Sequence, residues 1–192
     1  MKNLRGPLIG LVVIILIAGV FLIRPYNKLV VIEENVDQAY SQIDTQLQRR
    51  LDLIPNLVNT VKGFASHEQG VIQDISNARA NLAGAQGPEE QAAADAELSG
   101  ALSRLLVVVE NYPDLKADKQ FTQLMDELAG TENRIAVARK DYNDTVAEYN
   151  REVKRFPMNL VAGMFGFEKK EYFKADPAAQ SAPSVDFGTD GK

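Results

Sequence analysis

Apolar side chains recur every three or four positions along most of this chain. Two long segments, residues 27–65 and 117–155, each carry one continuous apolar face, and two shorter segments between them, ending near residues 83 and 112, repeat the spacing. This spacing is typical of amphipathic helices. The pattern predicts an all-α fold, an antiparallel four-helix bundle with two long and two short helices.

Polar, glycine and proline residues predict where these helices begin and end. Ser66, followed by Gln69, matches a capping box that would start the second helix. The sequence GAQGPEE, which begins at Gly84, predicts the end of that helix and a loop after it. Pro113 and Pro157 should end the third and fourth helices, because proline cannot continue a helix.

The predicted helices differ in length, and this difference has a consequence for packing. At 1.5 Å per residue the two long helices would extend about 57 and 58 Å, and the two short ones about 26 and 35 Å. Four helices would therefore pack together over one half of the bundle, and a coiled-coil stalk of two helices would form the other half. Two helices cannot cover all of their apolar surface.

An uncovered apolar face marks an interaction site. We therefore expect a homo-oligomer that packs side by side through the stalk. Tyr40, Tyr142, Tyr149 and Phe156 lie on the stalk faces and are candidate partner contacts, although packing in the core would explain the three tyrosines equally well.

The N-terminal region carries the strongest apolar signal. Residues 8–23 read LIGLVVIILIAGVFLI and include no charged side chain. Together with Gly6 and Pro7, this run is close in length to the ~20 residues that a helix needs to cross a bilayer. The run ends directly in Arg24 and Pro25, with no small-residue cleavage pattern after it. Residues 1–25 are therefore predicted to form a short tail and a transmembrane anchor rather than a cleaved signal peptide, with the helical bundle over residues 26–157.

The charged residues on the two sides of the predicted anchor give little information about its orientation in the membrane. Lys2 and Arg5 precede the apolar run, and Arg24 and Lys28 follow it. Lysine and arginine asymmetry sets membrane topology, and here the two sides balance. Our hypothesis is a single-pass membrane protein, with the bundle on the extracytoplasmic side.

A second apolar segment follows the fourth helix. Residues 158–174 begin with MNLVAGMFGF, which is too short to span a membrane, and continue with charged and aromatic residues. We expect this segment at the membrane interface or on neighbouring subunits, with Met164, Phe165 and Phe167 as candidate contacts. Packing back onto the bundle is the alternative. Residues 175–192 have the composition of a disordered tail.

Pro55 interrupts the first long helix within the sequence RRLDLIPNLVNTV. It lacks the N–H that would bond the Leu51 carbonyl, yet the apolar spacing continues in phase beyond it, so the helix should resume after a kink. The neighbouring polar residues that could satisfy the opened backbone groups are Arg50, Asp52, Asn56 and Asn59. The kink either bends the helix over the core or forms a polar notch for a partner.

Arg50 also predicts a contact between the two long helices. It lies at the edge of the apolar face, and an antiparallel register with Ala65 level with Ala117 places it opposite Glu132. A charge at a helix interface needs a partner. The register therefore predicts an ion pair between Arg50 and Glu132.

Composition excludes several classes of function. The net charge of −5 argues against nucleic acid as a partner, because phosphate binding needs a basic face. The chain has no cysteine and one histidine, His67, so a transition-metal site is not expected. No glycine-rich phosphate-binding motif occurs. The sequence thus predicts no catalytic residue, cofactor, metal or small-molecule substrate.

Two long segments resemble a known family. YNKLVVIEENVDQAYSQIDTQLQRRLDLIPNLVNTVKGF and YNREVKRFPMNLVAGMFGFEKKEYF are similar to the signature segments of the LemA family of bacterial membrane proteins, which includes a magnetosome protein. The resemblance implies a helical bundle on one N-terminal membrane helix, and no catalytic residues. Some members are encoded near a membrane metalloprotease.

Two functions are consistent with these observations. The first is a non-enzymatic, membrane-anchored scaffold that self-assembles or organises other envelope proteins. The alternative is an accessory subunit of a membrane protease or of another envelope quality-control complex.

Overall fold

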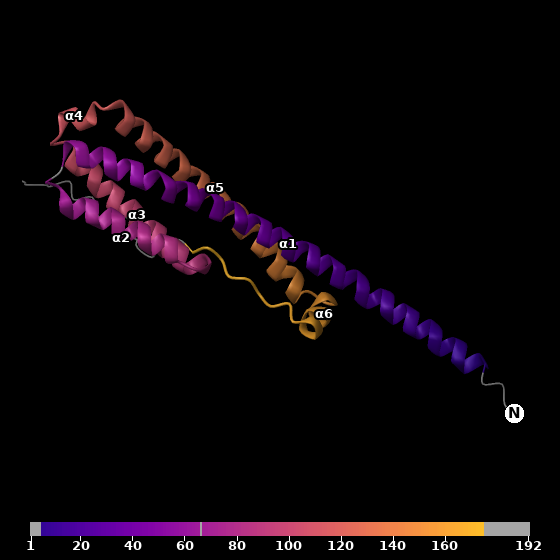
Figure 1. The fold of residues 1–192 in the computed structure, drawn as a ribbon. Helices are drawn as coiled ribbons and strands as arrows, with labels where there is room; N and C mark the ends of the chain where they lie inside the picture. The colour runs from indigo at the N-terminus through magenta and orange to yellow at the C-terminus, as the bar shows by residue number, and fades with distance from the viewer. Residues whose placement is uncertain (1–4, 66, 175–192) are drawn as a thin grey trace, which may run out of the picture. The chain divides into compact units, whose positions relative to one another are not determined.

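The computed structural model describes the backbone of residues 5–65 and 67–174, with the side chains of these residues other than 5–9, 11–18 and 21. Predictions for Ser66 and for the tail 175–192 lie outside the described residues. The helices are α1 (Arg5–Phe64), α2 (Gln69–Gly84), α3 (Gly87–Val109), the single turn α4 (Pro113–Lys116), α5 (Lys119–Lys154) and α6 (Met158–Phe165) (Figure 1). No strand occurs in the described part of the chain, and the all-α prediction is confirmed.

The chain folds into two compact units. Unit 1 comprises residues 1–46 and 133–172, and unit 2 comprises residues 47–132 and 173–192. Both α1 and α5 contribute to each unit, so residues 26–157, predicted as one bundle, are shared between them. The two units are described separately below.

α1 is one helix of 60 residues. It begins before the predicted position, residue 27, and it continues through Pro55, as the phase of the apolar spacing predicts. Among the described residues, none of the helices combines the length and the apolar composition that a membrane crossing requires.

In unit 2, parts of the long helices α1 and α5 pack with the shorter helices α2 and α3. α2 and α3 are antiparallel: Arg104 Nη2 lies 3.2 Å from Asp74 Oδ2, and Asn81 Nδ2 lies 2.9 Å from Glu97 Oε2. Apolar side chains from α1, α2, α3, α4 and α5 are buried here, among them Ile54, Leu57, Ile75, Leu98, Leu105, Leu115 and Leu128. Within this unit, the predicted packing of two long and two short helices is confirmed.

Several helix ends differ from their predicted positions. α2 begins at Gln69 with Glu68 as its N-cap, which makes no side-chain capping bond, and the predicted capping box rests on Ser66, which lies outside the described residues. The Glu68 carboxylate instead accepts a hydrogen bond of 2.8 Å from the Tyr112 hydroxyl. The predicted loop GAQGPEE is mostly helical, because α3 already begins at Gly87, whose φ of 76° makes the turn out of α2.

Proline and aspartate define the ends around α4. α3 ends at Val109, and Pro113 starts α4 rather than stopping α3, in accordance with proline's preference for the first turn. The carboxylate of Asp118 accepts a hydrogen bond of 2.8 Å from the Phe121 N–H, which satisfies a free donor at the start of α5.

Unit 1 is built on the seam between α1 and α5. Lys28 Nζ lies 2.8 Å from Glu152 Oε2, and the rings of Tyr40 and Tyr142 are 5.6 Å apart, so the two helices run antiparallel here. The buried side chains of the seam come from both helices: Leu29, Ile32, Val36, Ile43, Ile135, Tyr142, Val146 and Tyr149.

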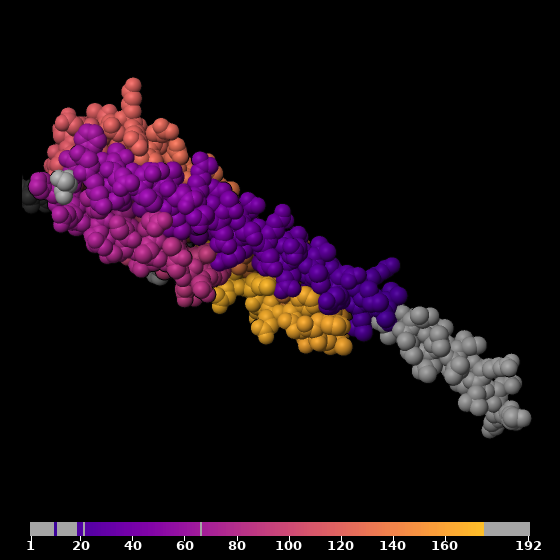
Figure 2. All heavy atoms as spheres, in the orientation of Figure 1, coloured from indigo at the N-terminus to yellow at the C-terminus, as the bar shows by residue number. Residues whose placement is uncertain are grey.

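The chain after α6 covers one flank of this seam. The Asn150 side chain donates to the Lys170 carbonyl and accepts from the Lys170 N–H, both at 2.9 Å. The Tyr142 hydroxyl donates to the Glu171 carbonyl at 2.9 Å, and Lys170 Nζ lies 2.8 Å from Glu33 Oε1. We call residues 166–172 the covering segment. Figure 2 shows its yellow-orange atoms and those of α6 against the indigo atoms of α1.

The predicted stalk of two uncovered helices differs from the structure, in which the covering segment lies on one flank of the seam. Tyr142 and Tyr149 are buried and therefore do not form an exposed face, whereas Phe156 is exposed and Tyr40 is half-buried. The reason is that α5 presents polar atoms at the flank of the seam, and an extended segment uses them to satisfy its backbone. The stalk is a two-helix seam with a cover on one flank.

α6 packs on α1. This agrees with the alternative prediction that residues 158–167 pack back onto the bundle. Leu29, Met158, Val161 and Ala162 form a buried apolar cluster, and the half-buried Phe167 packs against it. The ring of Tyr26 lies 4.8 Å from that of Phe165 and 5.7 Å from that of Phe167. Gly166, at a φ of 77°, closes the helix. The outer face of α6 stays exposed.

Candidate functional site

Arg50 forms a buried polar cluster in unit 2. Its side chain is 1% exposed, and its Nη1 lies 2.5 Å from Asp95 Oδ1 on α3. Its Nη2 donates to the Ser99 hydroxyl at 2.9 Å and lies 3.5 Å from Glu132 Oε2 on α5. The predicted ion pair between Arg50 and Glu132 is confirmed, and one guanidinium joins three helices.

Asp95 is the principal partner of Arg50. It is buried, whereas the Glu132 side chain is 56% exposed, so water screens the pair with Glu132. Sequence reasoning missed Asp95 and Ser99, although a signal existed: Asp95 occupies an apolar-face position of α3, three residues before Leu98. A guanidinium carries several N–H donors in a fixed planar arrangement, so the Arg50 side chain can join partners on different helices at once.

Pro55 is compensated from another helix. The Nε of Arg79, on α2, donates a hydrogen bond of 3.1 Å to the Leu51 carbonyl, the acceptor that Pro55 leaves without its helical partner. None of the four polar neighbours predicted for this task donates this bond, although Asn59 lies near Pro55 in the lining of a hollow. Asp52 accepts a bond from Gln48, Asn56 is exposed, and Arg50 is in the core.

A small hollow lies beside Pro55. Its volume is about 230 Å³, and its lining residues are Ile54, Pro55, Val58, Asn59, Ser76 and Arg79. Arg50, Asp52, Pro55 and Asn56 are the residues predicted to contact a partner here, and only Pro55 is among the lining residues. Partner binding at the hollow stays a prediction.

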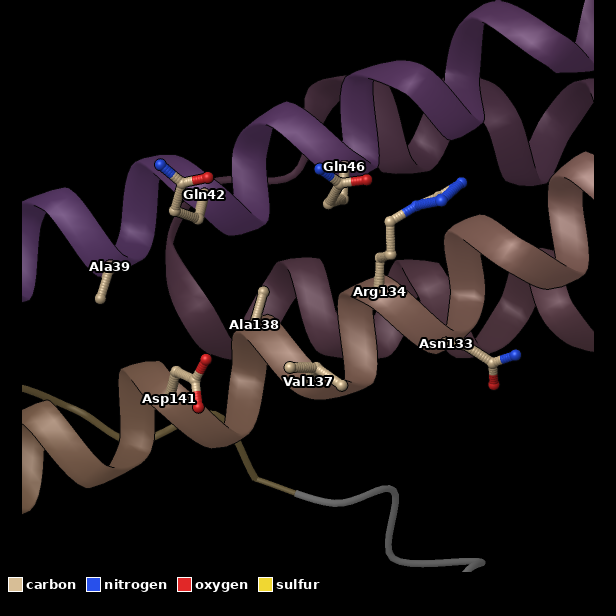
Figure 3. Close-up of a pocket in the computed structure, with 8 residues that line it drawn as sticks. All are labelled: Ala39, Gln42, Gln46, Asn133, Arg134, Val137, Ala138 and Asp141. Carbon is tan, nitrogen blue, oxygen red and sulfur yellow. The ribbon is translucent and has the colours of Figure 1, made fainter.

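A larger hollow lies on the other flank of the α1 and α5 seam in unit 1 (Figure 3). Its volume is about 390 Å³, and it is lined by Ala39, Gln42 and Gln46 of α1 and by Asn133, Arg134, Val137, Ala138 and Asp141 of α5. In Figure 3 Ala39 points toward α5 and Ala138 toward α1, and these two small side chains leave the space between the helices unfilled.

This hollow and the covering segment lie on opposite flanks of the seam. Successive residues of a helix are rotated by about 100°. On α1 this rotation places Gln42 and Gln46 on one side of the buried Ile43, and Glu33 and Tyr40 on the other. Since Glu33 pairs with Lys170 of the covering segment, the flank with Gln42 and Gln46 is the one left open.

Burial keeps the phenol groups of Tyr142 and Tyr149 protonated. Removal from water raises the pKa of Tyr142 to about 12 and that of Tyr149 to about 12. Both phenols therefore stay neutral at physiological pH, and they act as packing groups and, for Tyr142, as a hydrogen-bond donor to the covering segment.

The described residues hold no candidate metal site. No group of three or more histidine, cysteine, aspartate or glutamate side chains is placed there to hold a metal ion. His67 is exposed in the turn before α2.

Comparison with known proteins identifies the family. The model of the LemA family matches residues 39–187. The chain belongs to the LemA family. It is 30% identical to Magnetosome protein MamQ 2 of Paramagnetospirillum magneticum, over 92% of this chain and 76% of the relative. Magnetosome protein MamQ of Magnetospirillum gryphiswaldense is 28% identical over the same shares, and Protein LemA of Metamycoplasma hominis is 25% identical over 78% and 68%.

We predict that the two partners of Arg50 differ in their effect on stability. Arg50→Met removes the guanidinium that lies 2.5 Å from the buried Asp95 carboxylate and should lower the free energy of unfolding by about 3–5 kcal/mol. Glu132→Gln removes only the screened contact and should cost less than about 1 kcal/mol. Urea unfolding followed by circular dichroism measures both. Equal losses in the two variants would contradict this assignment.

We also predict that Arg79 matters only because of Pro55. Arg79→Met leaves the Leu51 carbonyl without a donor and should lower the free energy of unfolding by about 1–3 kcal/mol. Pro55→Ala restores the helical N–H, so Arg79→Met should cost far less when it is combined with Pro55→Ala. A double-mutant cycle by urea unfolding measures the difference; purely additive effects would show that Arg79 serves another purpose.

Proposed function

We propose that this protein is a non-enzymatic, membrane-anchored scaffold that self-associates side by side through the open flank of the α1 and α5 seam in unit 1. Membership of the LemA family indicates a membrane-associated protein. The location we propose is the bacterial inner membrane, with the helical units on its extracytoplasmic side.

The anchor in this proposal is the apolar run of residues 8–23. The sequence alone supports this anchor: the run has sixteen residues without a charged side chain, and it belongs to the uninterrupted helix α1. A helix without a break transmits the position of its anchor to the residues that follow it. Contacts made by Ala39 and Gln42 would therefore occur at a defined height above the membrane.

The observation that carries the proposal is the hollow at Ala39 and Ala138. Copies anchored in one membrane are confined to parallel orientations, which raises their effective concentration. In a two-fold pair the axis is then normal to the membrane, and equal residues face each other at equal height. Val137, 60% exposed, would meet its own copy beside the space that the alanines leave.

The rim of the hollow suits such a pair. Gln42, Gln46 and Asn133 carry side-chain amides, which donate and accept hydrogen bonds and can therefore bond to their own copies. The covering segment blocks the other flank, so only one surface of the seam is open to a second copy.

An accessory subunit of a membrane protease or of another envelope complex is the second candidate. The hollow beside Pro55 favours it, because its lining combines apolar side chains with Arg79 and Asn59 and lies in unit 2, outside the surface proposed for self-association.

The absence of cysteine in the natural sequence allows a direct test by crosslinking. We predict that Val137→Cys forms a disulfide-linked homodimer when membranes containing the full chain are oxidised. The matched control is Val107→Cys, which introduces a thiol at a comparably accessible site on α3, 71% exposed in the wild type. The ratio of dimer to monomer on a non-reducing gel is measured for each.

Each outcome of the crosslinking bears on the proposal. A dimer at residue 137 together with little dimer at residue 107 supports association through the hollow. Equal dimer at both positions indicates random collision and contradicts it. A linked product of another size with a different envelope protein favours the accessory-subunit alternative.

A further inference from the structure

The end of unit 1 presents an apolar stripe that the proposed scaffold does not use. Leu160 and Met164 are four residues apart on α6, Phe156 lies in the turn just before this helix, and each of the three side chains is more than half exposed. The opposite face of α6 is buried on Leu29. α6 is thus a short amphipathic helix whose outer face has no cover in the described part of the chain.

This stripe lies close to the end of the predicted anchor. Tyr26, which contacts the Phe165 ring, follows Ile23 by three residues, and Lys28, which pairs with Glu152, follows it by five. These separations correspond to about 4.5 and 7.5 Å along a helix. If residues 8–23 cross a bilayer, α6 and the last turn of α5 lie at the level of the lipid headgroups.

A basic hollow lies around the end of α5, and its lining residue Arg155 directly precedes Phe156 of the stripe. Its volume is about 380 Å³, and it is lined by Ala147, Asn150, Arg151, Lys154, Arg155 and Tyr172. Within the described residues no ion pair engages Arg151 or Lys154, and the exposed Arg155 side chain makes one contact of 3.9 Å with Glu152. Three cations therefore surround one cavity, in a chain whose net charge is −5.

Among the ion pairs of the described residues, only the contact of 3.9 Å between Glu152 and Arg155 joins an acidic group to a cation of this hollow. The Glu152 side chain is largely buried and is held by Lys28 at 2.8 Å, and Glu148 is exposed on the same helix without a place in the lining. Cations are also favourable at the C-terminal turn of any helix, but that preference requires neither a hollow nor an adjacent apolar stripe.

We propose that this end of unit 1 binds the surface of a membrane that contains anionic phospholipid. Arg151, Lys154 and Arg155 hold a lipid phosphate in the hollow through charge-assisted hydrogen bonds, while Phe156, Leu160 and Met164 insert into the boundary between headgroups and acyl chains. Basic side chains next to an apolar helix face are the pattern of recognition of anionic membranes. The proposal rests on the membrane anchor of the proposed function, and not on self-association.

The chain has no tryptophan, so a single introduced indole reports on the stripe alone. Full-length Leu160→Trp is reconstituted into vesicles of phosphatidylcholine, with or without phosphatidylglycerol, and quenching by lipids brominated on their acyl chains is measured. We expect several-fold stronger quenching when phosphatidylglycerol is present. Val107→Trp, on α3, is the control and should remain unquenched in both vesicles.

A second variant isolates the contribution of the cations. Arg151→Gln, Lys154→Gln and Arg155→Gln, combined in the Leu160→Trp chain, should remove the increase that phosphatidylglycerol causes. Equal quenching in both kinds of vesicle overturns the recognition of the headgroup. A blue-shifted emission without quenching overturns the proposal in favour of another protein, or a second copy, on the stripe.

The same samples separate this proposal from the proposed function. A chain that fails to float with the vesicles has no anchor, which contradicts the proposed function. A Leu160→Trp chain that floats, but whose indole is neither quenched nor shifted in its emission, keeps its anchor and loses only the proposed lipid contact. Crosslinking at residue 137 reports on self-association independently of both results.

Discussion

The unequal length of the helices is the constraint on which this structure depends. α2 and α3 belong to unit 2 alone, whereas α1 and α5 supply helical surface to both units. In unit 1 the seam of the two long helices must therefore find another cover, because apolar surface left in water costs about 25 cal/mol per Å². The covering segment fulfils this need through the two hydrogen bonds that join the Asn150 side chain to the Lys170 backbone.

The cover makes the seam asymmetric, and the proposed function depends on that asymmetry. One flank is occupied by residues 166–172, and the other retains the hollow at Ala39 and Ala138. A seam that was bare on both flanks would permit association in several geometries. In the proposed function, a seam with one open flank, on a helix anchored in the membrane, would restrict a second copy to one surface.

The sequence predicted the parts of the fold that periodicity and register control. Helical phase predicted that α1 continues through Pro55, and an antiparallel register alone paired Arg50 with Glu132. It did not predict the covering segment, because an extended strip held mainly through its backbone leaves no periodic pattern. The donor for the Leu51 carbonyl was missed because Arg79 lies on another helix, and proximity along the chain favoured the wrong residues.

The most direct test of this account is hydrogen exchange of the full-length protein, resolved to single amides in the covering segment. The Lys170 amide donates to Asn150 in the interior of the unit, so it should exchange far more slowly than an unstructured amide, and Asn150→Ala should abolish this protection without altering exchange in α3. Rapid exchange of Lys170 in the wild-type protein would show that the segment does not cover the seam, and would contradict the restriction of self-association to one flank.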